Sequence, residues 1–332
     1  MSKATVEMLD AWPRRLAPGH PRLDVAEEMM ALTLRIVAEA LFGAEVESAT
    51  NRVGEALEVV LHVTNARVKR SFDLPPGLPT PENLRFRRAV RVLDDVVAGM
   101  IRGRRSGETR DDLLSMLMQA RDPETGRGMD DRQLRDEVLT VFLAGHETTA
   151  NALTWSFYLL SQHPEEEARL EEEVDRVLGG RVPTLDDIGS LPRTGMVVQE
   201  AMRLYPPAWL FGRSPSQDDE IDGYRIEAGS LVFLSPYVTH RHPDLWPDPD
   251  RFLPERFAPA SLAAIDRFAY FPFGGGPRQC IGVAFANLEM QIVMASVVQR
   301  FRLRLAPDAQ VDMEPLVTLR PRHGMPMLAS AR

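Results

Sequence analysis

A single cysteine ends an unusual loop in the last fifth of the chain. Cys280 is the only cysteine among 332 residues, and it closes "FPFGGGPRQCIG" at 271–282. A lone thiol cannot form an internal disulfide, so it is a small buried hydrophobic residue, a nucleophile or a metal ligand. Only the thiolate binds metal or attacks carbon. The glycines at 274–276 allow the backbone to fold beneath the sulfur, the helix expected after Cys280 favours negative charge, and Arg278 adds a cation.

Several chemistries compete for this loop. A cysteine nucleophile needs a histidine base, and no local signature supplies one. Dinucleotide binding needs G-x-G-x-x-G, but Pro277 interrupts the loop and Gln279 stands where the last glycine should be. A single thiolate is sufficient when the metal arrives inside a macrocycle, as haem iron does. His240 and His242 suggest a metal pair, but beside prolines they are better interpreted as loop packing or hydrogen bonding.

A second polar stretch interrupts a long apolar helix predicted over 130–162. In "AGHETTAN", Gly145 costs about 1 kcal/mol relative to Ala inside a helix. Threonine hydroxyls after it can bond back to preceding carbonyls and open the helix. Two interpretations stay equally open: a place where a polar ligand approaches the backbone near Glu147 and Thr148, or a kink with a solvated polar patch. A zinc-protease helix is disfavoured because Ala150 replaces the second histidine.

An acid and a base lie three residues apart in "QEAMRLYPP". Glu200 and Arg203 share one face of the helix predicted over 192–204, a spacing that most often gives a weak surface ion pair. Two prolines then stop the helix, and Arg256 follows in the proline-stiffened "DPDRFLPERF". A buried carboxylate shared by both guanidiniums would be a structural lock, and removing one partner would cost about 3–5 kcal/mol.

The composition is that of a globular protein, with 44% apolar and 26% charged residues. A net charge of −9 argues against a general nucleic-acid binder. One cysteine fits a reducing cytoplasm, and no apolar run approaches the roughly 18 residues that a membrane helix needs. The N-terminus lacks the apolar core of a secretory signal. We therefore expect a cytoplasmic protein without a membrane segment or a nucleic-acid partner.

Helical periodicity dominates the chain up to about Leu204, and short strands and prolines follow up to about Pro277. The pattern predicts helices near residues 24–42, 49–67, 82–103, 111–120, 130–162, 164–178, 192–204 and 282–301. Short strands are expected within 224–237 and a final hairpin within 316–328, and 72–84 is interpreted as a surface connection. The predicted fold class is mainly α with a small β region.

Four motifs in this order, "AGHETT", "EAMR", "PERF" and "FGGGPRQCIG", resemble those of the cytochrome P-450 (haem-thiolate monooxygenase) family, in its bacterial soluble type. The cysteine loop matches the family pattern F-G-x-G-x-R-x-C-x-G at every fixed position. The resemblance covers nearly the whole chain and implies a cytochrome P-450-like fold in a single haem domain over 1–332. Family members have helices and strands before the region that Met1 enters, so we expect the fold to be N-terminally truncated.

The resemblance implies a role for each residue on the thiolate side. Cys280 would be the axial ligand of haem b (iron protoporphyrin IX). Arg278 and Arg213 would meet the haem propionates, while Phe273 and Gly274 would shape the loop under the sulfur. The structural triad behind the haem would consist of Glu200, Arg203 and Arg256.

The resemblance also implies an oxygen side. Ala144 and Gly145 would line the oxygen site, Thr148 would hold a water in the opened helix, and Glu147 would feed protons to it. Substrate would lie near Ala144. Further substrate contacts are expected from two short segments, residues 208–210 and residues 316–317.

The implied activity is insertion of one oxygen atom from O2 into a small apolar organic substrate. No flavin or iron–sulfur module is attached, so electrons would come from a separate ferredoxin, flavodoxin or reductase. Arg300, Arg302 and Arg304 would dock an acidic partner or form a solvated charged end. The alternatives are a truncated, catalytically impaired haem-binding fragment, and a structural helical protein with a buried cysteine.

Overall fold

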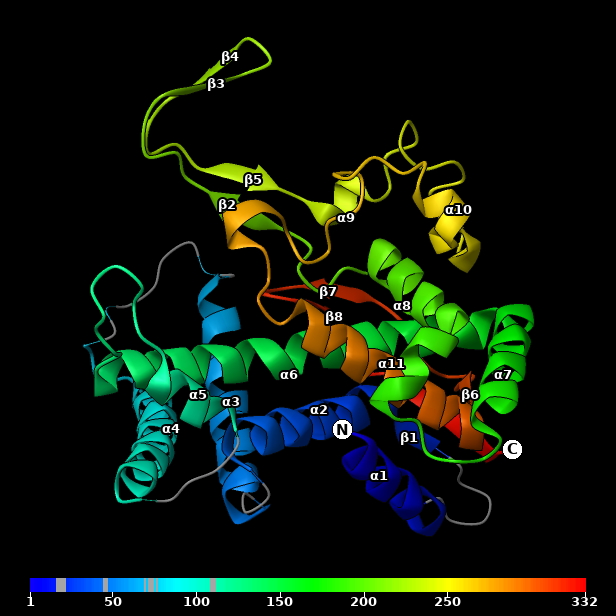
Figure 1. Cartoon of the computed structure of the whole chain (residues 1–332), viewed down its shortest axis with the longest axis horizontal. Helices are drawn as coiled ribbons and strands as arrows, with labels where there is room; N and C mark the ends of the chain where they lie inside the picture. The colour runs from blue at the N-terminus through cyan, green and yellow to red at the C-terminus, as the bar shows by residue number, and fades with distance from the viewer. Residues whose placement is uncertain (16–21, 44–46, 69, 71–74, 76, 108–111) are drawn as a thin grey trace. The chain divides into compact units, whose positions relative to one another are not determined.

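The computed structural model describes residues 1–15, 22–43, 47–68, 70, 75, 77–107 and 112–332. These residues form two compact units (Figure 1): Met1–Ala26 with Asn151–Arg332, and Glu27–Ala150. The division along the chain falls within the long helix α6 (Asp131–Gln162), after Ala150. The single haem domain expected over 1–332 stays a prediction.

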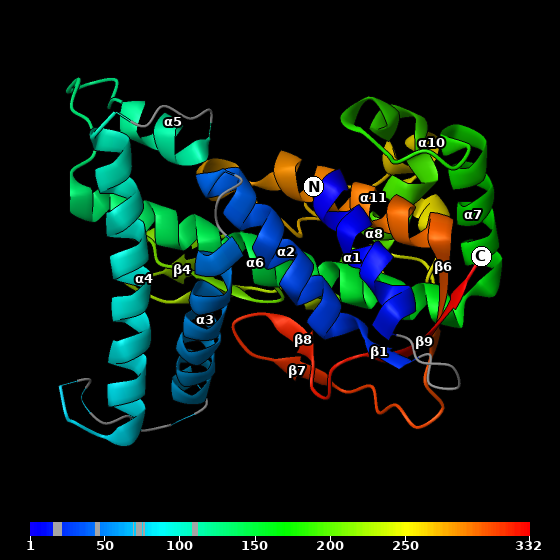
Figure 2. The same ribbon diagram turned by 90° about the horizontal axis from the view of Figure 1, so that it is seen from below.

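The unit Glu27–Ala150 is helical. It contains α2 (Val25–Phe42), α3 (Glu47–Val68), α4 (Pro81–Arg105), α5 (Leu113–Gln119) and the first part of α6. Thr80 caps α4 by accepting the Asn83 N–H at 3.1 Å, and Asp112 caps α5 through the Ser115 N–H at 2.9 Å. Figure 2 shows α3 and α4 side by side, and their apolar faces share one core with α2, α5 and α6.

The other unit is built around the buried middle of α11 (Val283–Arg300). Three helices pack against α11: α1 (Ser2–Arg15), α7 (Pro164–Leu178) and α8 (Pro192–Leu204). Short helical turns complete the unit: η1 (Leu185–Ser190), α9 (Pro236–Thr239), η2 (Pro254–Phe257), α10 (Pro259–Leu262) and η3 (Gly276–Arg278).

The strands of this unit are short and antiparallel. In the largest sheet, β9 (Pro326–Ala331) lies between β1 (Arg22–Asp24) and β6 (Phe301–Leu305). Three further pairs are β2 (Phe211–Arg213) with β5 (Val232–Leu234), β3 (Asp219–Ile221) with β4 (Tyr224–Ile226), and β7 (Met313–Pro315) with β8 (Leu319–Pro321). The predicted class, mainly α with a small β region, is confirmed.

The final hairpin predicted over 316–328 is wrong in its pairing. β8 pairs with β7, the strand before it in the chain, whereas β9 pairs with β1 and β6. The cause is the corner at Gly324, which has a φ of 70° and lies so close to Asp24 that a Cβ there would be 2.0 Å from its Oδ2. The Asp24 carboxylate accepts the Met325 N–H at 2.9 Å and directs β9 toward β1.

Two other differences concern the sequence before residue 90. The helix α1 was not predicted, although its Leu9 and Trp12 are fully buried. Pro13 lies inside this helix, and a proline at an interior position normally argues against a helix. Residues 72–74 and 76 of the surface connection predicted over 72–84 lie outside the described residues. Residues 75 and 77–79 are exposed, as expected of a connection, and 81–84 instead form the start of α4.

Candidate functional site

The loop before Cys280 is held by its own backbone. The Gly274 N–H donates to the Phe271 carbonyl at 2.9 Å, and the Cys280 N–H donates to the Phe273 carbonyl at 2.9 Å. Gly274 has a φ of 70° and Gly276 a φ of 67°, in the left-handed region where a side chain is strained. The glycines therefore allow the tight turns that bring Cys280 back beside Phe273.

The sulfur lies at the start of α11. A Cβ placed on Gly282, the N-cap residue, would be 3.8 Å from the Cys280 Sγ, which is van der Waals contact. Unpaired N–H groups at a helix N-terminus favour negative charge, so this position suits a thiolate. Cys280 is exposed among the described residues, and Ile281 beside it is 97% exposed. The interpretation of Cys280 as a buried hydrophobic residue is therefore wrong.

Two exposed arginines belong to the same compact unit as the cysteine loop. Arg278 is exposed within the loop, and Arg213 is exposed at the end of β2. The Arg213 guanidinium lies 4.8 Å from the Phe211 ring centre and donates to the Gly212 carbonyl at 2.9 Å. The Phe211 ring in turn packs edge-on against Phe271, with centres 6.1 Å apart, which ties β2 to the loop. Within the described ranges, neither guanidinium pairs with an acid.

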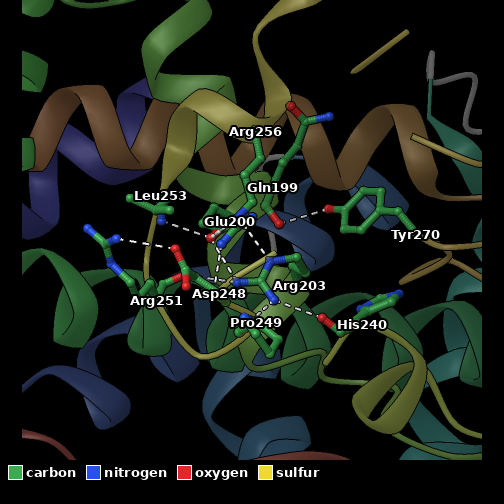
Figure 3. Close-up of polar contacts among 10 residues, drawn as sticks. All are labelled: Gln199, Glu200, Arg203, His240, Asp248, Pro249, Arg251, Leu253, Arg256 and Tyr270. Carbon is green, nitrogen blue, oxygen red and sulfur yellow. Dashed lines mark hydrogen bonds and ion pairs between the residues drawn. The ribbon is translucent and has the colours of Figure 1, made fainter. Parts of the chain in front are cut away.

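The structure brings Glu200, Arg203 and Arg256 together (Figure 3). Arg203 donates from Nε to one Glu200 oxygen at 2.7 Å and from Nη2 to the other at 2.9 Å. Arg256 Nε reaches Glu200 Oε1 at 3.3 Å, and the Leu253 N–H donates to the same oxygen at 2.8 Å. Glu200 and Arg203 have no exposed surface, whereas Arg256 is half-buried.

The remaining Arg203 donors hold the chain that follows β5. Nη1 donates to the His240 carbonyl at 2.7 Å and to the Pro249 carbonyl at 2.6 Å, and Nη2 donates to the Arg251 carbonyl at 3.0 Å. One guanidinium therefore fixes three points of an irregular segment. We call Glu200, Arg203 and Arg256 the ion-pair cluster.

The polar stretch of α6 belongs to the unit Glu27–Ala150. Ala144 is exposed, and the Thr148 hydroxyl donates to the Ala144 carbonyl at 2.6 Å. Glu147 is 3% exposed, so the stretch is not simply a solvated polar patch. A Cβ on Gly145 would lie 3.0 Å from Val37 Cγ2, so the glycine permits close approach of α2 to α6.

The arginines after α11 are paired within the chain. Arg300 lies 2.7 Å from Asp10, Arg302 is bidentate to Glu171 at 2.7 Å, and Arg304 pairs with Glu167. The sequence suggested these arginines as a docking surface for an acidic partner. Their charges are already neutralised by acids on α1 and α7, so they offer no free basic surface.

The two segments expected to contact substrate, residues 208–210 and 316–317, are joined by a hydrogen bond. Trp209 Nε1 donates to the Leu316 carbonyl at 2.9 Å. In the part of the chain that the structure describes, no three metal-binding side chains cluster and no helix has the length and apolarity to span a bilayer.

The fold is mainly helical, and an exposed cysteine lies directly before α11. This arrangement is typical of a protein that binds a metal through a single cysteine thiolate. The chain belongs to the cytochrome P-450 family, whose sequence model matches residues 1–325. It is 41% identical to cyclooctatin synthase of Streptomyces melanosporofaciens over 303 residues, which is 90% of this chain and 65% of the relative. It is also 41% identical to pentalenene oxygenase of Streptomyces avermitilis over 302 residues, 90% of this chain and 66% of that protein.

The solved structures agree with this assignment. The heme domain of cytochrome P450DA superposes with a TM-score of 0.91 at 29% identity, covering 100% of this chain and 72% of that one. The chain therefore spans just under two thirds of the length of the first two relatives, at 65% and 66%, and 72% of the solved heme domain.

Proposed function

We propose that the protein is a haem-thiolate monooxygenase that inserts one atom of O2 into a small apolar organic substrate. The observation that carries the proposal is the cysteine loop, which presents the only thiol of the chain at the N-terminus of α11. Two relatives, a pentalenene oxygenase and a cyclooctat-9-en-7-ol 5-monooxygenase, are by their names oxygenases of organic compounds, which supports this choice.

The residues present fit a haem. Cys280 is exposed and lies at the N-terminus of α11. Arg278 and Arg213 pair with no acid among the described residues, and guanidiniums are groups that bind carboxylates such as propionates. Bound haem supplies O2 binding and the oxidation itself, and a thiolate ligand favours O–O cleavage. We propose haem b as the cofactor, with Phe273 and Gly274 shaping the loop.

The protein residues would position the groups and move protons. We assign Cys280 as the ligand that the loop holds, and the ion-pair cluster as the structural support of the segment before it. On α6, Ala144 and Gly145 are assigned to the oxygen site. The Thr148 hydroxyl would hold a water there, and Glu147 would exchange a proton with that water.

The electron donor and the location are also part of the proposal. Electrons would come from a separate ferredoxin, flavodoxin or reductase, since a monooxygenase needs two per turnover. A cytoplasmic location fits the single free thiol, because a reducing compartment keeps such a thiol from oxidising.

The carbon monoxide spectrum of the reduced protein tests the ligand. The chain loaded with haem should give the long-wavelength Soret band of thiolate-bound iron, and Cys280→Ser should lose that band. Ile281→Ala is the matched control, because it changes the neighbouring exposed side chain and leaves the sulfur. A band typical of a neutral-thiol or histidine ligand in the unsubstituted chain would contradict the proposal, as would a chain that takes up no haem.

A panel of apolar compounds tests the substrate class. Fatty acids, terpenes and aromatics are added to the ferric protein, and the spin-state shift is recorded. We expect the shift with apolar ring compounds such as pentalenene. A response confined to charged or sugar-like compounds would overturn the substrate assignment.

A further inference from the structure

We propose that His240 is a positioning residue, whose ring connects the ion-pair cluster to the start of the cysteine loop. His240 has no exposed surface and lies just after α9. Two of its acceptors bind separate parts of the chain. Its carbonyl receives Arg203 Nη1 at 2.7 Å (Figure 3), and its Nε2 receives the Phe271 N–H at 3.0 Å.

A chain of hydrogen bonds continues from Phe271 to the sulfur-bearing residue. The Phe271 carbonyl accepts the Gly274 N–H at 2.9 Å, and the Phe273 carbonyl accepts the Cys280 N–H at 2.9 Å. The first residue of the loop is thus held by His240, and the last by the loop itself. A shift of Phe271 therefore displaces both turns that present Cys280.

Two aromatic rings pack against the His240 ring. The Tyr270 ring centre lies 5.2 Å away, and the Phe271 ring lies edge-on at 5.3 Å. The Tyr270 hydroxyl donates to the Gln199 carbonyl at 3.0 Å, which anchors one of these rings to α8. These rings pack against the imidazole, whose Nε2 meets the backbone of the loop at Phe271.

This geometry determines the tautomer of His240. Because Phe271 donates its N–H, Nε2 is unprotonated and the ring proton is on Nδ1. Nδ1 is buried and has no hydrogen-bond partner among the described residues. Burial, followed by the positive charge of Arg203, lowers the pKa of His240 to about 3, which keeps the ring neutral. An imidazolium would present a donor to the Phe271 N–H and break the connection.

The role of this connection in holding a thiolate ligand rests on the proposed function. The hydrogen-bond path itself does not, so it can be tested in the haem-free chain. Amide hydrogen exchange at Phe271 reports directly on the bond to Nε2. The variant pair is His240→Gln, whose side-chain oxygen can replace Nε2 as acceptor, and His240→Met, which has similar size and no comparable acceptor.

We expect His240→Met to increase exchange at Phe271 about 10-fold relative to amides of α7, since a lost hydrogen bond is worth about this factor. His240→Gln should restore most of the protection. His242→Met is the control, because His242 is exposed two residues further on and should leave Phe271 unchanged. Unchanged protection in His240→Met, or equal loss in both His240 variants, overturns the proposal.

Two further measurements keep the test decisive if His240→Met folds poorly. In the unsubstituted chain, the ¹⁵N resonance of His240 Nε2 should be that of an unprotonated ring nitrogen, and a protonated Nε2 would refute the proposed contact. With haem bound, His240→Met should lower the fraction of thiolate-type carbon monoxide band, and His240→Gln should recover it. If no version shows that band but Phe271 exchange responds as expected, the proposed function fails and the role of His240 stands.

Discussion

Glu200 and Arg203 form a two-pronged ion pair within one turn of α8, and neither side chain has any exposed surface. Every donor of the Arg203 guanidinium meets an oxygen, either of Glu200 or of a backbone carbonyl. Burying two charges is expensive in itself, so such a pair is tolerated only when its hydrogen bonds are complete. Removing Glu200 therefore leaves the buried charge of Arg203 without an acid, and removing Arg203 leaves Glu200 with only the 3.3 Å contact to Arg256 as an ion pair.

We predict that Arg203→Leu lowers the free energy of unfolding by about 3–5 kcal/mol, because the buried Glu200 loses its two-pronged partner and keeps only the longer contact to Arg256, at 3.3 Å, and the Leu253 N–H. The double variant Glu200→Leu with Arg203→Leu should be less destabilised than the sum of the single variants. Urea unfolding followed by circular dichroism measures all three.

The matched control for this experiment is Lys3→Ala. Lys3 forms a pair with Glu7 at 3.9 Å on the surface of α1, and its side chain is 80% exposed. An exposed pair of this kind contributes about 0.2–1 kcal/mol at most. A loss at Arg203 no larger than the loss at Lys3 would show that the ion-pair cluster is not a structural lock.

The spacing of Glu200 and Arg203 alone favoured a weak surface ion pair, and the cluster with Arg256 was expected from the neighbouring prolines and the family resemblance. The sequence could not show that the carbonyls of His240, Pro249 and Arg251 complete it. Those groups lie 37, 46 and 48 residues from Arg203, in a segment without regular periodicity. The backbone position of such a segment depends on tertiary packing, which side-chain patterns do not encode locally.

The same limit explains the wrong hairpin near the C-terminus. Alternating residues predicted strands there, and β8 and β9 do form. Their partners depend on Asp24, which bonds to Met325 from 301 residues away. The cysteine loop is the opposite case, because its glycines and the start of α11 are local. The turns within the loop could therefore be expected from 12 consecutive residues, but the bond from Phe271 to His240, 31 residues away, could not.

A second prediction concerns Glu289 in the middle of α11. It has no exposed surface, and neither carboxyl oxygen has a hydrogen-bond partner among the described residues. Burial raises its pKa from 4.5 to about 8. Between these two pH values the folded chain keeps a proton that the unfolded chain has released. This group therefore lowers stability as pH rises through that window, by about 1.4 kcal/mol per pH unit.

The variant Glu289→Gln should remove this part of the pH dependence. We expect its free energy of unfolding to exceed that of the unsubstituted chain at pH 7 to 8, with the difference shrinking toward pH 5. Urea unfolding at four pH values measures it, and Glu165→Gln on the exposed face of α7 is the control. Parallel pH profiles for Glu289→Gln and the unsubstituted chain would show that Glu289 is ionised in the folded state.

A third prediction concerns the contact between Gly145 and Val37. Alanine at 145 gains about 1 kcal/mol of helix propensity, but its Cβ would lie 3.0 Å from Val37 Cγ2. We expect Gly145→Ala to destabilise the chain when Val37 is present and to stabilise it in a Val37→Ala background. A double-mutant cycle of thermal or urea unfolding gives the coupling energy. Additive effects would mean that Val37 moves aside freely and that the glycine has another cause.

A fourth prediction separates the hydroxyl of Thr148 from its bulk, and it rests on the proposed monooxygenase activity. Thr148→Val keeps the shape but removes the donor that meets the Ala144 carbonyl at 2.6 Å. If this hydroxyl holds the water through which protons arrive, product formation per electron pair consumed should fall about 10-fold or more, since positioned proton transfer contributes about 10²–10⁴-fold. Thr148→Ser, which retains the hydroxyl, should stay close to the unsubstituted protein. Equal product yields from Thr148→Val and Thr148→Ser would show that the hydroxyl has no part in proton delivery. Its role would then be limited to the hydrogen bond with the Ala144 carbonyl within the helix.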